Sequence, residues 1–248
     1  MGETIVFTSG KGGVGKTTTI ANIGVGLSQL DKKVIMLDTD MGLRNLDVVM
    51  GLETQVNYNL LDLLDSKCKL QQALIRDKRF PNLYMIPASL KLLSMDQYKH
   101  KFQRLLDHLK QEFDYCLIDC PAGIDQCFYF AISVADRAII LTTPQISAVK
   151  DANRVIQILN GTSIKRLEVI INEYDEKMVR KHYVLSKEDI QDLFDIPVLG
   201  TIPYDYKVTI SQNNGVPVMT MRSKATKSFL FLSQKLVTNE LFEREVVL

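Results

Sequence analysis

The stretch Ser9-Gly10-Lys11-Gly12-Gly13-Val14-Gly15-Lys16-Thr17 decides the fold of this chain. It follows an apolar run, Ile5-Val6-Phe7, and opens a segment with helical apolar periodicity. Gly10 through Thr17 fits the pattern G-x-x-x-x-G-K-T. In a phosphate-binding loop, glycines follow a strand, and their backbone N–H groups donate hydrogen bonds to a polyphosphate. The dipole of the helix that comes next further stabilises the negative charge. The bland alternative is a glycine-rich turn that binds nothing, and it does not explain a strand before and a helix after.

Each residue of this loop carries a separate part of the expected chemistry. Lys16 is expected to reach the β- and γ-phosphates of a nucleotide, and the Thr17 hydroxyl is expected to hold Mg²⁺. Lys11 is unusual, because a phosphate loop does not require a cation at its second position. Its side chain could fold over its own nucleotide, reach a phosphate held by a second subunit, or simply be solvated. The predicted phosphate-binding residues are Gly10, Lys11, Gly12, Gly13, Val14, Gly15, Lys16, Thr17 and Thr18.

Length and composition fit one large α/β domain. The chain has 248 residues, of which 46% are hydrophobic and 24% are charged, as in a globular protein with a substantial core. Its 30 basic and 29 acidic residues leave a net charge of +1, which gives no global attraction to DNA or to an anionic membrane. We therefore expect a single domain over residues 1–248 that does not bind DNA.

Cysteine usage and hydropathy indicate the compartment. The four cysteines, Cys68, Cys116, Cys120 and Cys127, form no C-x-x-C pair, so we expect free thiols rather than a disulfide framework or a zinc site. The N-terminus has no charged-then-apolar leader, and no apolar run approaches the ~18 residues of a membrane span. These features predict a cytoplasmic protein.

Apolar runs alternate with amphipathic stretches along the whole chain. This alternation predicts a doubly wound α/β fold, with a mainly parallel sheet of about seven to eight strands flanked by helices. Several runs are near-continuous Val, Ile and Leu, as in strands covered on both faces. Together with the phosphate loop, this pattern is that of a P-loop NTPase. The expected strands are 4–8, 33–38, 83–87, 115–119, 137–142, 167–172 and 198–203.

Helical periodicity fills the spaces between these strands. In the segment 97–111, Tyr98, Phe102, Leu105, Leu106 and Leu109 recur at helical spacing and are expected in the core. Ser186 is a candidate N-cap. The span 43–79 is the least strand-like and reads as an insertion near the phosphate edge of the sheet, where a switch or partner surface would lie. The expected helices are 17–30, 60–64, 70–75, 97–111, 148–159, 186–194 and 224–241.

Two strand ends supply carboxylates beside the phosphate loop. Leu37-Asp38-Thr39-Asp40 closes one strand and Asp119 closes another, and in an open parallel sheet both ends lie at the carboxyl edge. An apolar strand that ends in Asp is the Walker-B arrangement, so Asp119 is expected to support Mg²⁺. Asp40 is the candidate that positions the attacking water. Asp38 either belongs to the magnesium shell or only fixes the loop by hydrogen bonds.

These residues resemble a known family. Lys11 to Thr17 is similar to the deviant Walker-A loop of the ParA/MinD family of P-loop ATPases, whose extra lysine matches Lys11. The resemblance runs over almost the whole chain and is strongest to the members that determine the septum site in bacterial division. It is carried further by Asp40-Met41-Gly42-Leu43-Arg44-Asn45-Leu46-Asp47, Met50-Gly51, Ala73-Leu74-Ile75-Arg76-Asp77-Lys78-Arg79, Asn82-Leu83-Tyr84, Pro87-Ala88-Ser89 and Asp119-Cys120-Pro121-Ala122-Gly123-Ile124.

The resemblance implies a Mg²⁺-dependent ATPase that binds ATP as a monomer, dimerises with both nucleotides at the interface, and separates on hydrolysis. Lys11 would then contact the ATP of the partner subunit, and Asp40 would hold the lytic water. Thr17, Asp38, Asp40 and Asp119 are the residues expected at Mg²⁺. Asn172 would read the adenine, and Pro203, Tyr204 and Asp205 would pack against it. Regulatory division-site proteins of the MinC or MinE kind, or another topological-specificity factor, would bind near the loop 40–47.

One departure from the family concerns the C-terminal helix and tail, residues 224–248. Family members typically end in a basic amphipathic helix that docks on anionic lipid, whereas 242–248 carries acidic residues and lacks a lysine-rich face. Direct membrane binding therefore stays open, and a peripheral place at the inner face of the cell membrane requires a longer native tail. Within the last helix, Phe229, Leu230, Phe231, Leu232 and Leu236 are expected to pack on the sheet.

Three other functions share parts of this pattern. A ParA-type DNA-partitioning ATPase is disfavoured by the near-neutral charge and by the segment after Asp40. A flagellar-number regulator of the same superfamily ranks second, because its usual sequences differ around Arg44 and Cys120-Pro121. An iron–sulfur reductase needs suitably placed interface cysteines, and only Cys120 lies in a relevant loop.

Overall fold

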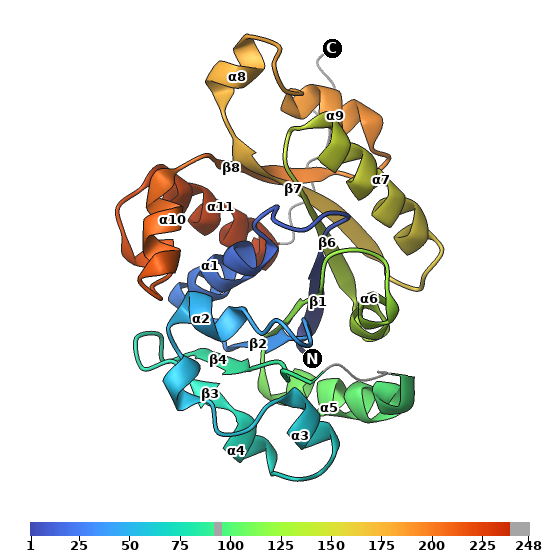
Figure 1. Ribbon diagram of the computed structural model, residues 1–248, viewed down its shortest axis with the longest axis vertical. Helices are drawn as coiled ribbons and strands as arrows, with labels where there is room; N and C mark the ends of the chain where they lie inside the picture. The colour runs from blue at the N-terminus through green and yellow to red at the C-terminus, as the bar shows by residue number, and fades with distance from the viewer. Residues whose placement is uncertain (92–95, 239–248) are drawn as a thin grey trace.

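The computed structural model describes residues 1–91 and 96–238, and its centre is one eight-stranded sheet (Figure 1). The strand order is β3-β4-β2-β5-β1-β6-β7-β8. All neighbouring strands pair in parallel except β3 and β4, which are antiparallel. The predicted doubly wound, mainly parallel sheet is confirmed. The strands are β1 (Glu3–Thr8), β2 (Val34–Asp38), β3 (Ile75–Arg76), β4 (Leu83–Ile86), β5 (Tyr115–Asp119), β6 (Arg137–Thr142), β7 (Arg166–Tyr174) and β8 (Val198–Pro203).

Helices cover both faces of this sheet (Figure 1). Residues of α1, α2 and α11 form one hydrophobic core with one set of strand side chains, and residues of α3, α5, α6, α7 and α9 form a second core with the other set. The α-helices are α1 (Lys16–Gln29), α2 (Leu46–Met50), α3 (Leu60–Leu64), α4 (Leu70–Ala73), α5 (Lys99–Glu112), α6 (Gln126–Ile132), α7 (Ile146–Asn160), α8 (Glu176–Arg180), α9 (Lys187–Leu193), α10 (Tyr206–Asn213) and α11 (Lys224–Thr238). Short 3-10 turns span Glu53–Gln55, Asp96–Tyr98 and Val218–Thr220.

The central strands are apolar at nearly every position because their alternate side chains pack into the two cores. In β5, Cys116 and Ile118 pack into one core, whereas Tyr115 and Leu117 pack into the other. Successive side chains of a strand point to opposite faces, so a strand covered on both sides needs apolar residues at every position. The near-continuous apolar runs therefore predicted their strands well, and β5, β6 and β8 have the predicted bounds.

The edge of the sheet differs from the sequence prediction. The helix predicted over 70–75 is wrong in its last two residues, because α4 ends at Ala73 and Ile75–Arg76 forms β3. Ile75 pairs with Met85 of β4 and is buried, so tertiary pairing and burial outweigh the local helical pattern. Strand β7 also runs past its predicted end, to Tyr174.

The helix predictions hold for the longer segments. Ser186 caps α9 as expected, accepting the backbone N–H of Asp189 at 3.0 Å. In α11, Phe229, Leu232 and Leu236 are buried as predicted, but the side chain of Phe231 is 51% exposed and carries the Lys235 ammonium 4.7 Å from its ring centre. The prediction for Phe231 was wrong, because a fifteen-residue helix packed on one sheet buries only one stripe of its surface. The end of the predicted helix and the tail, 239–248, lie outside the described residues.

No helix among the described residues is both long enough and apolar enough to cross a membrane.

A buried ion pair joins three strands at the amino end of the sheet. The Arg137 side chain is 1% exposed, and its Nε donates to Glu168 Oε2 at 2.5 Å. Glu168 is 2% exposed, and Glu3 lies 3.8 Å from the Arg137 Nη1 atom. The strands β1, β6 and β7 are thus tied together at the edge opposite the phosphate loop.

We expect Glu168→Ala to lower the free energy of unfolding by about 3 kcal/mol, because it leaves the buried Arg137 guanidinium with only the more distant carboxylate of Glu3 beside it. The double variant Arg137→Met/Glu168→Leu is expected to recover most of that loss, since it removes both charges and keeps the volume. Urea unfolding followed by circular dichroism measures both values. A double variant no more stable than Glu168→Ala would contradict this explanation.

Candidate nucleotide-binding site

The phosphate loop connects β1 to α1 at the carboxyl edge of the sheet. Gly13 and Gly15 have φ of 80° and 84°, which a side chain disfavours. Gly15 also has no room for a side chain, because an added Cβ would lie 2.2 Å from Asn172 Nδ2. No side chain caps α1 at Gly15, so the N–H groups of its first turn point from a bare helix N-terminus. This arrangement is the anion cradle that the sequence predicted.

A cavity of about 670 Å³ opens over this loop. It brings together most of the predicted site residues: Lys11, Gly12, Gly13, Val14, Gly15, Lys16, Thr17, Thr18, Asp40, Asn172, Pro203, Tyr204 and Asp205 all line it. Gly10, Asp38 and Asp119 do not. Gly10 packs against α7, where an added Cβ would lie 2.3 Å from the Asp151 carbonyl oxygen.

Lys16 and Asp119 form an ion pair beside the cavity. Lys16 Nζ lies 2.9 Å from Asp119 Oδ1, and the two side chains are 8% and 1% exposed. Burial disfavours the charged ammonium, but the Asp119 carboxylate outweighs it, so the pKa of Lys16 is raised. The second oxygen of Asp119, Oδ2, is buried and has no hydrogen-bond partner among the described residues. An unpaired buried carboxylate oxygen is costly, which indicates a site for a cation or for a donor.

Asp38 stands next to Asp119 and fixes the loop that follows it. The two residues are in register on the paired strands β2 and β5. Asp38 Oδ1 accepts the Asp40 N–H at 2.9 Å, and Oδ2 accepts the Leu46 N–H at 3.2 Å. Burial and the neighbouring Asp119 carboxylate raise the pKa of Asp38 to about 8. These bonds support the loop-fixing role, and a role at the metal stays a prediction.

The Asp40 carboxyl group lies at the cavity wall, at the start of the loop to α2. Burial raises its pKa, and the Lys16 ammonium opposes that effect. Further along the loop, the guanidinium of Arg44 binds Asp47, with Nε donating to Oδ2 at 2.7 Å. Asp47 is fully buried, so this pair anchors the end of the loop at the start of α2.

The donor set suits a small hard cation. Mg²⁺ prefers oxygen ligands and keeps several waters. The Thr17 hydroxyl and the unpaired Asp119 Oδ2 offer oxygens of that kind at the same edge of the sheet. The residues present therefore fit Mg²⁺, and the roles predicted for Thr17, Asp38, Asp40 and Asp119 remain predictions.

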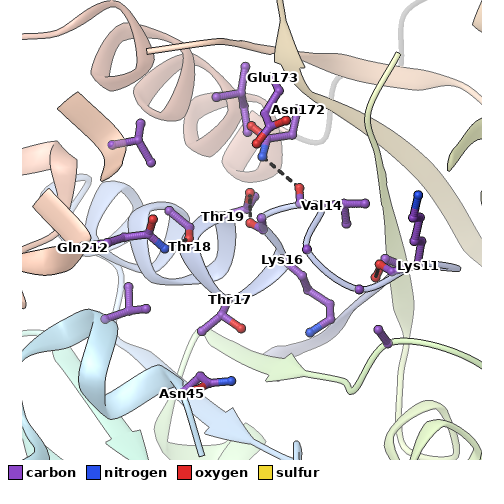
Figure 2. A pocket seen from close by; sticks show the side chains of 18 of the residues that line it. Lys11, Val14, Lys16, Thr17, Thr18, Thr19, Asn45, Asn172, Glu173 and Gln212 are labelled. Atoms are coloured by element: carbon purple, nitrogen blue, oxygen red, sulfur yellow. Dashed lines mark hydrogen bonds between the residues drawn. The ribbon is translucent and has the colours of Figure 1, made fainter. Parts of the chain in front are cut away.

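Lys11 differs from Lys16 in its surroundings. It is exposed, and among the described residues its ammonium makes no ion pair or hydrogen bond. Figure 2 shows its side chain pointing away from that of Lys16. A charged group placed in this way at the cavity rim is available to a second molecule.

The other end of the cavity is formed by β7, β8 and α10. Asn172 Nδ2 donates to the Val14 carbonyl at 2.9 Å, which anchors the phosphate loop (Figure 2). Tyr204 is 63% exposed. Asp205 instead caps two helices, because its carboxylate accepts the N–H groups of Lys207 and Lys224, each at 3.0 Å.

Sequence reasoning missed one wall of this cavity, helix α10. Val208, Thr209 and Gln212 line it from this helix, and Gln212 Nε2 donates to the Thr18 hydroxyl. The two side chains lie next to each other in Figure 2. The signal was present, since Asp205 is an N-cap type and the three lining residues recur at helical spacing after it.

A glycine-rich loop between a central strand and a buried helix, with carboxylates at neighbouring strand ends, defines a P-loop nucleotide-binding protein. Comparisons with known proteins narrow the class. A family model described as an AAA domain matches residues 2–174. The septum site-determining protein MinD of Synechocystis is 46% identical over 88% of this chain and 82% of its own length.

Solved structures agree with this assignment. The MinC:MinD cell division protein complex of Aquifex aeolicus contains a chain that matches with a TM-score of 0.89 and 37% identity, covering 96% of this chain and 97% of its own. MinD from Pyrococcus horikoshii, solved in complex with Mg-ADP, matches with a TM-score of 0.85 and 31% identity, covering 95% and 96%. The chain belongs to the MinD family of septum site-determining P-loop ATPases.

The pKa of Asp38 predicts a pH-dependent stability in the nucleotide-free protein. The unfolded chain releases this proton near pH 3.8, whereas the folded protein keeps it up to about pH 8. Between those values the folded state binds more protons, so the free energy of unfolding falls as pH rises, by at most about 1.4 kcal/mol per pH unit. Urea unfolding from about pH 5 to about pH 8 should show a shallower fall for Asp38→Asn than for the parental protein. Parallel curves would contradict the assignment to Asp38.

Proposed function

We propose that this protein is a Mg²⁺-dependent ATPase that dimerises when ATP is bound and separates after hydrolysis, and that it acts in placing the bacterial division site. ATP and ADP are the expected nucleotides. The observation that carries this proposal is the contrast between the two lysines of the phosphate loop. Lys16 is buried and paired with Asp119 at 2.9 Å, whereas Lys11 is exposed at the cavity rim.

Each lysine suits a different phosphate. Lys16 is the first residue of α1, and its side chain lines the cavity of its own subunit. Lys11 points elsewhere (Figure 2), and a cation supplied to a partner's phosphates can stabilise the transferred charge as an arginine finger does. Because only ATP carries the γ-phosphate, contacts to it from both subunits give the dimer the differential affinity that a switch needs.

Asp40 is the residue proposed to orient the attacking water. It faces the cavity from the end of β2, and the hydrogen bond from its N–H to Asp38 fixes its backbone. The Lys16–Asp119 ion pair is proposed to open when nucleotide binds, so that Lys16 turns to the phosphates and Asp119 becomes available to the metal. When bound, Mg²⁺ would neutralise part of the negative charge on the phosphates.

The proposed partners follow from the family. A MinC-type regulator is proposed to bind the dimer near the loop 40–47, where Leu43 and Val48 are 67% and 47% exposed. The proposed location is the cytoplasm, with attachment to the inner face of the membrane depending on residues beyond Thr238. Sedimentation with anionic liposomes in ATP and in ADP tests that attachment.

Three alanine variants separate the proposed roles. Lys16→Ala is expected to lose nucleotide binding, because the buried cation at the phosphates is gone. Lys11→Ala is expected to bind Mg·ADP normally but to stay monomeric with Mg·ATP. Asp40→Ala is expected to dimerise with ATP but to hydrolyse it about a hundredfold more slowly. Equilibrium binding, light scattering and phosphate release measure the three properties.

Lys78→Ala serves as the matched control for Lys11→Ala, since Lys78 is an exposed lysine that does not line the cavity. It is expected to behave as the parental protein. ATP-driven dimerisation and partner-stimulated hydrolysis that both survive Lys11→Ala would remove the cross-subunit role.

A further inference from the structure

The Arg79 guanidinium ties together three segments that are distant in sequence. Its Nη2 donates to the Met50 carbonyl at the end of α2, and its Nη1 donates to the Gly215 carbonyl at 3.3 Å. Asp77 holds the guanidinium in place, with Nε to Oδ1 at 3.0 Å and Nη2 to Oδ2 at 2.7 Å. Asp77 is 2% exposed. The fork geometry of an arginine is suited to holding two backbone carbonyls and one carboxylate together.

The two carbonyls belong to turns that touch each other. Gly51 ends α2 with φ of 63°, and Gly215 follows α10 with φ of 61°. An added Cβ at Gly51 would lie 2.3 Å from the Gly215 carbonyl oxygen, and one at Gly215 would lie 2.8 Å from Gly51 Cα. The backbones therefore meet without side chains between them. Arg79 closes this contact from outside, because its guanidinium reaches both sides.

The joined elements form neighbouring walls of the nucleotide cavity. Asn45, Val48 and Val49 line it from the loop and α2, whereas Val208, Thr209 and Gln212 line it from α10. Helices α2 and α10 lie side by side in Figure 1 and contact each other. The helix α2 is only five residues long and continues directly from the Asp40 loop. Leu46, Val49 and Met50 pack it into the core, and Arg79 adds a hydrogen bond that holds its far end.

We propose that Arg79 is a positioning residue for the ATPase reaction, one that clamps the end of α2 to the turn after α10 and so places the Asp40 loop over the nucleotide. This inference rests on the proposed function for its kinetic consequence. The clamp also couples the two walls, because neither turn can move without breaking a bond to the same guanidinium. The hydrogen bonds of the Arg79 guanidinium among the described residues go to Met50, Gly215 and Asp77, so Arg79 acts through the ends of α2 and α10 and not by touching the phosphate loop.

The test compares Arg79→Gln with Arg76→Gln. Arg76 lies in the same hairpin and is exposed. Its Nε donates to the Pro81 carbonyl at 3.0 Å and its guanidinium lies 5.8 Å from the centre of the Tyr84 ring, so its variant removes the same charge and leaves the clamp intact. We expect Arg79→Gln to lower kcat for ATP by about tenfold to a hundredfold, because displacing a group that holds the reacting water has an effect of that size. The Kd for Mg·ADP is expected to change by less than about threefold, since the phosphate loop is untouched. Arg76→Gln should match the parental protein.

Amide hydrogen exchange gives a readout that does not depend on catalysis. The Gly51 N–H bonds to the Val48 carbonyl at 3.0 Å, and the Val216 N–H bonds to the Ser211 carbonyl at 3.0 Å. Arg79→Gln is expected to speed exchange at both turns together, with the rest of the sheet unchanged. Arg79→Lys should restore part of kcat, because one ammonium can reach one carbonyl but cannot hold both.

A second variant guards against a folding defect in Arg79→Gln. Gly215→Ala leaves Arg79 intact but pushes the two turns apart, so it is expected to give the same loss of kcat and the same faster exchange. Unchanged exchange at both turns in Arg79→Gln would overturn the clamp. Unchanged kcat in Arg79→Gln, alongside slow hydrolysis by Asp40→Ala, would overturn its role in placing Asp40. Absence of ATP hydrolysis by the parental protein would refute the proposed function, and the exchange data would still decide on the clamp.

Discussion

Two buried carboxylates meet at the carboxyl edge of this sheet, and the site is organised around that constraint. Asp38 and Asp119 end neighbouring strands in register, and both are essentially buried. Two buried like charges at such a place cannot both ionise cheaply. Lys16 compensates Asp119 by the ion pair at 2.9 Å, whereas burial and the neighbouring Asp119 carboxylate raise the pKa of Asp38 to about 8. A divalent cation at this edge would favour the ionised form of Asp38, because an opposite charge nearby lowers the pKa of a carboxyl group.

At the opposite edge of the sheet, the buried charged side chains pair with one another. Arg137 binds Glu168 with Glu3 nearby, all at the amino ends of the strands. That ion pair ties β1, β6 and β7 together, although Arg137 Nη1 has no hydrogen-bond partner among the described residues. The ion pair that stabilises the fold thus lies at the amino ends of the strands, and the candidate ligand site lies at their carboxyl ends. A fold built in this way can hold an electrostatically unsatisfied site without losing its core.

The sequence predicted what depends on local pattern and failed where distant contacts decide. The apolar runs of β5, β6 and β8 gave their bounds, because a strand buried on both faces must be apolar at each position. The phosphate loop was readable because its glycines and Lys16 occupy a fixed spacing. Strand β3 was not readable, since Ile75 is extended only because Met85 is beside it. The ion pair of Lys16 with Asp119 joins residues 103 positions apart, and the contact of Arg79 with Gly215 spans 136, so neither leaves a trace at short range.

The two lysines of the loop carry different information about function. A lysine paired with a buried carboxylate gives up that partner when phosphate binds, so part of its binding energy is spent on breaking the pair. Lys11, whose ammonium makes no ion pair or hydrogen bond with the part of the chain that the structure describes, has no such cost, and its full attraction is available to a group that approaches the rim. On the proposed function, that approaching group is the nucleotide of a second subunit, and its γ-phosphate decides whether the attraction outweighs the cost of association. Lys16 then sets how tightly any nucleotide is held, and Lys11 sets how strongly the assembled state depends on ATP.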